Sequence, residues 1–456
     1  MRNLVCVGAC YLDTILSVPR FPEEDSKLRA TSLSVRRGGN CPNSLEVLQQ
    51  LLKAQEQGQQ SHKVRPYLIS CLPSAEGPAS ARVRDSFGPD SPVDFTRCIY
   101  REQHDQPASS YIIRSEATGT RTLVNYNDLP EMSVHEFQAA IEGLGRRNDM
   151  WVHFEVRRPN PSPLASPVPN TLRDAILTTA TLLVVQGRIP ETTLRCIQYL
   201  RQAMPKASIS VEVEKPDREG LQELAAEADV VFYSKSWAEV SVVGRRSVAA
   251  STAVDTFTAQ RMPQGAGKGW EVAKLTIWQS NGYRSAHECL MAQSEVARRA
   301  SLLLCTWGAE GAASLSLPSK RCVSCPALRP GQTVRVVEYV STTSTPATHQ
   351  HPTQSKHPSV LIDTPACYRE RKGAKTPENM TDEIPDCSTV GAGDTFIAGM
   401  LYGLLCHQDD WDADTKVRFA VQLATSKVQV EGFGGVGTQV MGDGGDGPDQ
   451  KATPLS

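Results

Sequence analysis

The chain has 456 residues, of which 40% are hydrophobic and 21% charged, and its formal net charge at pH 7 is −2. This length can bury a substantial core, and the near-zero charge implies neither a nucleic-acid partner nor an anionic membrane. The 13 cysteines are scattered rather than packed into a short secreted framework, which favours reduced thiols and a cytoplasmic protein. We expect no signal peptide, because no basic segment precedes an apolar stretch, and no membrane span, because no apolar run reaches about 18 residues.

Short apolar strands alternate with helical segments along the chain. Strands are expected at residues 4–7, 64–69, 151–154, 181–185, 208–213, 230–232 and 302–306. Helical patterns such as 191–203 and 217–226 lie between them. This alternation predicts an α/β fold with a doubly wound, mainly parallel sheet and helices on both faces. In such sheets, ligands bind beyond the carboxyl ends of the strands.

An early motif at residues 37–44, RGGNCPNS, leads from a glycine pair into a predicted helix. Its proline suits the first turn of that helix. Asn40 and Asn43 lie three residues apart, so both can offer amide donors and acceptors to a polyol. Helix capping by Asn40 alone is the alternative interpretation.

The most informative segment comes late, at residues 388–396, STVGAGDTF, and leads into an apolar run. That run predicts a buried helix with Gly391, Ala392 and Gly393 at its N-terminus, where unpaired N–H groups and the helix dipole favour phosphate. Asp394 would repel a phosphate, but it suits a base that takes a proton from a hydroxyl nucleophile. A plain helix-capping loop is the alternative for this segment taken alone.

Together with Asp13 after the first strand, these motifs resemble the ribokinase-like, PfkB-type carbohydrate kinases, and among them the ketohexokinases most closely. Further matches follow in family order at residues 24–29, 119–130, 151–155, 210–216, 229–235, 307–312 and 432–435. The resemblance implies one ribokinase-like carbohydrate kinase domain over residues 1–437, and the composition of residues 438–456 predicts a disordered tail. Within the domain we expect a small antiparallel β-sheet lid from 13–35 and 98–125, with insertions at 245–300 and 341–385.

The resemblance also implies a reaction, the transfer of the ATP γ-phosphoryl group to a primary hydroxyl of a ketohexose such as fructose, with Mg²⁺ on the nucleotide. Asp394 would be the general base, and the amides of Gly391, Ala392 and Gly393 would form the anion hole. Sugar contacts are expected from Asp13, Asp25, Gly39, Asn40 and Asn43. Nucleotide contacts are expected from Arg121, Lys235, Gly308, Ala309, Glu310 and Gly311.

Several points stay open at this stage. Asp25 resembles the ketohexokinase lid aspartate that reaches into the partner subunit's site, which would imply a homodimer through the lid. A K⁺ requirement near Gly434 and Gly435 is undecided, and Ser388 stands where the family usually has Asp, which leaves Mg²⁺ handling undecided. A kinase of ribose or a nucleoside, and a non-catalytic homologue that binds sugar or nucleotide, are the alternatives. The intact Asp394 argues against a pure binder, which has no use for a base.

Overall fold

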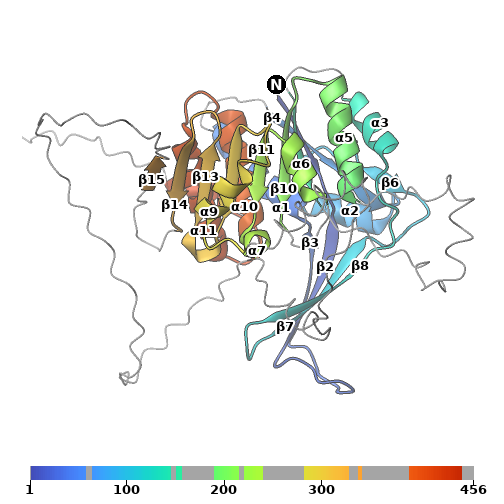
Figure 1. The fold of residues 1–456 in the computed structure, drawn as a ribbon. Coiled ribbons are helices and arrows are strands. Elements are labelled where there is room, and N and C mark those ends of the chain that lie inside the picture. Colours follow the sequence, from blue (N-terminus) through green and yellow to red (C-terminus); the bar gives the residue numbers. More distant parts are fainter. Residues whose placement is uncertain are drawn as a thin grey trace, which may run out of the picture.

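The computed structural model describes residues 2–57, 64–144, 150–156, 189–214, 220–239, 282–327, 337–340 and 390–443. These residues form a nine-stranded sheet flanked by helices, a four-stranded sheet that projects away from it, and a two-stranded sheet (Figure 1). The expected strand at 181–185, the expected insertion at 341–385 and most of the insertion at 245–300 lie outside the described residues.

The nine-stranded sheet has the order β15-β14-β13-β12-β11-β10-β9-β1-β4. Its parallel part consists of β12 (Leu302–Thr306), β11 (Val230–Tyr233), β10 (Ser208–Val213), β9 (Met150–Glu155), β1 (Arg2–Val7) and β4 (Val64–Ile69). Antiparallel strands continue one edge: β13 (Ala312–Ser316), β14 (Arg321–Cys325) and β15 (Val337–Val340). The predicted mainly parallel sheet is confirmed, and each strand expected within the described residues is present.

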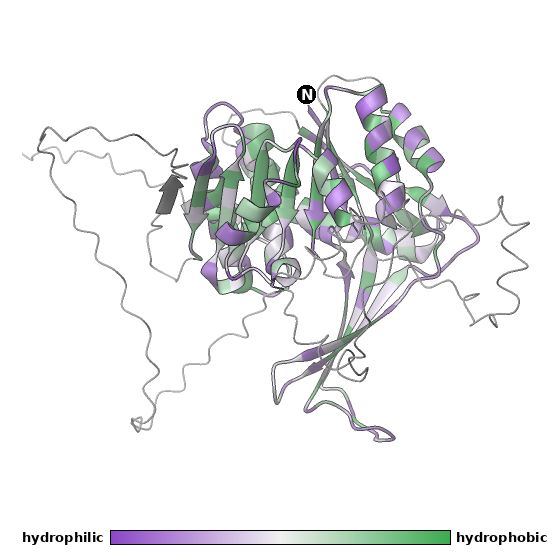
Figure 2. Cartoon of the chain, in the orientation of Figure 1, coloured by the Kyte–Doolittle hydropathy of each residue, from purple (hydrophilic) through white to green (hydrophobic). Residues whose placement is uncertain are grey.

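Helices cover both faces of this sheet, because successive strand residues point to opposite sides and both sides are apolar. One face packs against α3 (Val134–Glu142), α5 (Ile189–Ala203), α6 (Leu221–Glu227) and α9 (Ala286–Gln293). The other packs against α1 (Asn40–Gln57), α2 (Pro78–Asp85), α10 (Ala392–Cys406) and α11 (Ala413–Val428). Figure 2 shows the hydrophobic strands between these layers. No helix in the described part of the chain has the length and apolar character of a membrane span.

The four-stranded sheet is the lid, with order β3-β2-β7-β8. It comprises β3 (Ser32–Gly38), β2 (Tyr11–Val18), β7 (Ala108–Ser115) and β8 (Arg121–Tyr126). The expectation of a wholly antiparallel lid was wrong, because β2 and β7 pair in parallel. Both strands leave the main domain and run outward, and only strands joined by a hairpin must be antiparallel. In addition, β6 (Ile99–Arg101) pairs with β5 (Cys71–Pro73) and is not part of the lid sheet.

The expected boundary between the domain and its tail also needs correction. Helix α12 (Val436–Asp443) continues past residue 437, with Val436 and Val440 buried in the core. The Gly437 amide donates a hydrogen bond of 2.9 Å to Oε1 of Gln50 on α1. Residues 438–443 therefore belong to the folded domain, and residues 444–456 lie outside the described residues.

Candidate active site

A cleft of about 660 Å³ lies between the carboxyl ends of the parallel strands and the lid. The ends of β9, β10, β11 and β12 form one wall, and β2, β7 and β8 form the opposite one. The starts of α1 and α10 complete it. The cleft brings together most of the predicted site residues, namely Asp13, Gly39, Asn40, Asn43, Arg121, Gly391, Gly393 and Asp394. Its position at the carboxyl edge is the usual ligand site of such sheets.

The start of α10 has the geometry of an anion site. Gly391 caps the helix with φ of +80°, and a Cβ there would lie 2.3 Å from Cζ of Phe433, so the position requires glycine. A Cβ on Gly393 would meet no atom within 4 Å, so the backbone is accessible there. The amides of the first helical turn have no acceptor within the helix, and they carry the positive end of its dipole. This turn can therefore hold a phosphoryl group.

Asp394 lies in that first turn, and its side chain is buried. Nδ2 of Asn43 donates a hydrogen bond of 2.8 Å to its Oδ2, and Oγ of Ser44 donates to its backbone carbonyl at 2.9 Å. Burial raises the pKa of Asp394 to about 7, and the charges of Glu214 and Glu155 add to the rise. The Asn43 hydrogen bond and the Arg37 charge oppose it. A carboxylate with a pKa near neutrality suits a general base.

Glutamates at the ends of β9 and β10 also line the cleft, and the sequence reasoning did not count them as site residues. Nδ2 of Asn40 lies 3.2 Å from Oε2 of Glu214 and from both carboxylate oxygens of Glu212, to which it donates. Oε2 of Glu155 accepts from the amides of Ala9 and Cys41 at 3.3 and 3.4 Å. Burial raises the pKa of Glu212 well above its ordinary value, with further contributions from neighbouring carboxylates. Charged residues at the carboxyl ends of apolar strands were the signal in the sequence.

The glycine pair before α1 makes room for the lid aspartate. A Cβ on Gly38 would lie 2.4 Å from Oδ2 of Asp13. Gly39 has φ of +106°, and a Cβ there would lie 2.0 Å from the Ala9 carbonyl oxygen. Burial raises the pKa of Asp13, whereas a hydrogen bond with Ser110 and nearby arginines lower it. Asp13 thus projects into the cleft beside the start of α1.

The remaining predicted residues do not line the cleft. Lys235 begins the short helix α7 (Lys235–Ala238), its Nζ lying 5.5 Å from the centre of the Trp307 ring and 3.3 Å from Oε1 of Glu239. The neighbouring turn η3 (Gly308–Glu310) and Gly311 follow β12. Ala392 is part of the α10 turn without facing the cleft, and Asp25 lies on an exposed lid turn with φ of +57°. Ser388 lies outside the described residues.

Comparison with known proteins agrees with this architecture. Residues 382–437 match the pfkB family carbohydrate kinases. Ketohexokinase from Mus musculus is 26% identical over 440 residues, which cover 95% of this chain and 99% of that protein.

Solved structures with the same fold include ribokinase from Giardia lamblia, with a TM-score of 0.55 and 13% identity over 97% of this chain and 98% of that one. Ribokinase from Arabidopsis thaliana, complexed with ribose and ATP, has a TM-score of 0.51 and 12% identity over 96% of this chain and 98% of that one. These likenesses show the ribokinase fold. The match over residues 382–437 and the ketohexokinase similarity make this chain similar to the pfkB family carbohydrate kinases.

Proposed function

We propose that this sugar kinase transfers the γ-phosphoryl group of ATP to a primary hydroxyl of a ketohexose such as fructose, with Asp394 as the general base. One observation carries the proposal: a buried carboxylate with a pKa of about 7 sits at a helix N-terminus, in the same cleft as Asp13 and Asn40. The base, an anion site and polar groups that suit a polyol therefore converge.

The reaction is an in-line displacement at the γ-phosphorus. Asp394 accepts the proton of the attacking hydroxyl, and the amides of Gly391, Ala392 and Gly393 stabilise charge on the transferring group. Arg121, on the lid strand β8, lines the cleft and would contact the phosphates. Lys235 and the turn after β12 lie outside the cleft lining, and we expect them to contact the part of the nucleotide that extends beyond the cleft.

The donor set of the cleft fits Mg²⁺ that arrives with the nucleotide. Glu155, Glu212 and Glu214 supply hard oxygen ligands, and Mg²⁺ is usually held by one or two carboxylates together with phosphates and water. In the described part of the chain, no group of three or more Asp, Glu, His or Cys side chains would hold a metal unaided. When bound, Mg²⁺ neutralises charge on the β- and γ-phosphates.

The lid side of the cleft favours a polyol as acceptor. Asp13 and Ser110 occupy paired positions on β2 and β7, and Asn125 pairs with Ser110 on β8, so polar side chains form one row across the lid. Tyr11 also lines the cleft, and an aromatic ring there would suit a nucleobase. A nucleoside kinase is therefore the second candidate.

The test is ADP release by the purified chain with Mg-ATP and fructose, ribose or adenosine as acceptor. Turnover with fructose well above that with the other acceptors supports the proposal. Preference for ribose or adenosine would keep the mechanism and replace the acceptor. ATP binding without turnover on any of them would contradict the proposal and favour a non-catalytic homologue.

We expect kcat/KM to rise with pH through an apparent pKa of about 7, because only the carboxylate form of Asp394 accepts the proton. Initial rates between about pH 5.5 and pH 8.5, at constant ionic strength and saturating Mg-ATP, measure this profile. Full activity down to about pH 5 would show that a group with an ordinary carboxylate pKa acts instead.

We also propose that a second copy of the chain covers the outer face of the lid. Its polar row faces the cleft, whereas Leu33, Tyr111, Val124 and Tyr126 on the lid strands are 52% exposed or more, with Leu33 at 65% and Val124 at 62%. Tyr111 and Val124 are direct partners on β7 and β8, so their side chains share a face. Such an exposed apolar face is typical of a protein interface.

We expect Val124→Asp to shift the chain from dimer to monomer in sedimentation velocity, because an isologous interface would bury the new charge twice. The matched control is Gln202→Asp, at an exposed position of α5 away from the lid. A wild-type chain that stays monomeric at tens of micromolar protein would refute the proposed dimer.

A further inference from the structure

Arg37 is a buried arginine that the proposed chemistry does not use. It lies at the end of β3, and only 2% of its side chain is exposed. Its guanidinium lies 4.4 Å from the centre of the Phe87 ring and forms an ion pair with Glu46. A buried cation with this many dedicated partners is held in one orientation.

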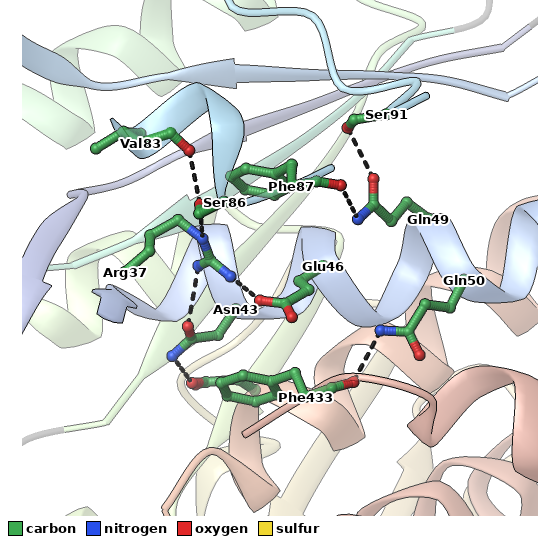
Figure 3. Close-up of polar contacts among 11 residues, drawn as sticks. Arg37, Asn43, Glu46, Gln49, Gln50, Val83, Ser86, Phe87, Ser91 and Phe433 are labelled. Atoms are coloured by element: carbon green, nitrogen blue, oxygen red, sulfur yellow. Dashed lines mark hydrogen bonds and ion pairs between the residues drawn. The ribbon is translucent and has the colours of Figure 1, made fainter. Parts of the chain in front are cut away.

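The guanidinium also contacts the residue that bonds to the proposed base. Nη1 of Arg37 donates to Oδ1 of Asn43 at 3.0 Å, and Nε donates to Oγ of Ser86 at 3.1 Å (Figure 3). The other end of the Asn43 amide, Nδ2, donates to Oδ2 of Asp394 at 2.8 Å. Arg37, Asn43 and Asp394 thus form a directed chain of hydrogen bonds from β3 through α1 to α10.

The direction of this series of hydrogen bonds follows from the chemistry of Arg37, its first donor. A guanidinium has only donors, so the amide group of Asn43 must turn its oxygen toward Arg37. Its NH₂ group must then face Asp394, and a hydrogen bond from NH₂ stabilises the ionised carboxylate. A flipped Asn43 would place its oxygen against Oδ2, which only a protonated Asp394 could satisfy.

We propose that Arg37 is a positioning residue that fixes the Asn43 amide with its NH₂ group toward Asp394, and thereby keeps the base ionised and oriented for proton transfer. This inference rests on the proposed role of Asp394. Arg37 does not touch the reacting atoms in this scheme; it acts through Asn43.

The charges around Asp394 give Arg37 this influence. Glu155 on β9 and Glu214 after β10 raise the pKa of Asp394, as burial does, and Arg37 lowers it. Glu212 on β10 and Lys427 on α11 also interact with Asp394. Without Arg37, the amide of Asn43 is free to flip, and the Arg37 charge no longer offsets the charges of Glu155 and Glu214. The pKa of Asp394 then rises further, so less of it is ionised at neutral pH.

The experiment compares pH profiles of kcat for wild type, Arg37→Met and Arg37→Lys. We expect the acid limb of Arg37→Met to move up by about one pH unit, with kcat at pH 7 lower by several-fold and KM for the sugar little changed. Arg37→Lys keeps a cationic donor and is expected to recover part of the shift. If the role of Arg37 were purely structural, Arg37→Met would lower the stability of the protein and leave the acid limb of the kcat profile in place.

Two controls separate positioning from other effects. Ser86→Ala removes one hydrogen bond of Arg37 and leaves its bond to Asn43, so the limb should not move. In an Asn43→Ala background, Arg37→Met should add only the smaller shift that the loss of its charge causes, because the path through Asn43 is already broken. A full additional shift in that background would show that Arg37 acts by its charge alone and would overturn the inference.

The result is separable from the proposed function. If Asp394→Asn abolishes turnover while Arg37→Met leaves the acid limb unchanged, the base stands and the positioning role of Arg37 falls. If Asp394→Asn retains wild-type turnover, the proposed base itself is wrong, whatever the Arg37 variants do.

Discussion

Asp394→Asn is expected to lower kcat by about 10²- to 10⁴-fold, because the amide keeps the shape of the side chain and cannot accept the hydroxyl proton. The substrate contacts should survive, since Oδ1 of the new amide can still accept from Asn43. KM for sugar and ATP should therefore change little. Steady-state ADP release over a range of both substrates separates the two parameters.

The same substitution should not destabilise the chain. Because the pKa of Asp394 is about 7 in the folded state and 3.8 ordinarily, the folded state binds more protons between these pH values. Stability from this group therefore falls as pH rises through that window. The neutral Asn escapes this loss, so at pH 8 the melting temperature of the variant should equal or exceed that of wild type. A marked drop would trace the loss of activity to misfolding.

Gly391→Ala is expected to lower kcat/KM by about 10²-fold or more. The φ of +80° costs a non-glycine residue about 1–2 kcal/mol, and the new methyl would overlap the Phe433 ring at 2.3 Å. To relieve this overlap, either the loop at Gly391 or the Phe433 ring must move. A displacement of about 1 Å in a catalytic group can lower the rate a hundredfold. Steady-state kinetics measures the loss, and thermal unfolding reports its cost in stability.

The matched control for this variant is Gly88→Ala. Gly88 has a similar φ of +86°, but a Cβ there would meet no atom within 4 Å. Gly88→Ala therefore introduces the same backbone strain without a steric overlap. Gly88 also lies outside the cleft. Equal losses of activity in both variants would mean that the geometry at Gly391 is not specific to catalysis.

The sequence was sufficient to predict the parallel part of the sheet, because buried parallel strands are short apolar runs with recognisable helices between them. The antiparallel edge strands β13, β14 and β15 were not predicted. It was also sufficient to place Asp13, Asn40 and Asp394 near one another, because each follows or begins an element at the carboxyl edge. It did not reveal that β2 and β7 pair in parallel, since strand direction depends on contacts between distant segments. The helix over 436–443 was hidden by the glycines around it.

The polar chemistry inside the cleft was harder to predict. Glu155, Glu212 and Glu214 stand at the carboxyl ends of apolar strands, but only the packing of β9 and β10 brings them into one cleft with Asp394. Likewise, the guanidinium of Arg37 reaches Asn43 only because β3 leads directly into α1. The roles of Lys235, the 308–311 turn, Asp25, and K⁺ near Gly434 and Gly435 stay predictions.

Product analysis by ³¹P NMR tests the central claim most directly. After incubation with Mg-ATP and fructose, we expect a new phosphate monoester whose phosphorus couples to the two protons of a methylene carbon, the mark of a primary hydroxyl. The signal should be absent with Asp394→Asn under the same conditions. ATP converted only to ADP and inorganic phosphate, or an ester on a secondary carbon, would contradict the account.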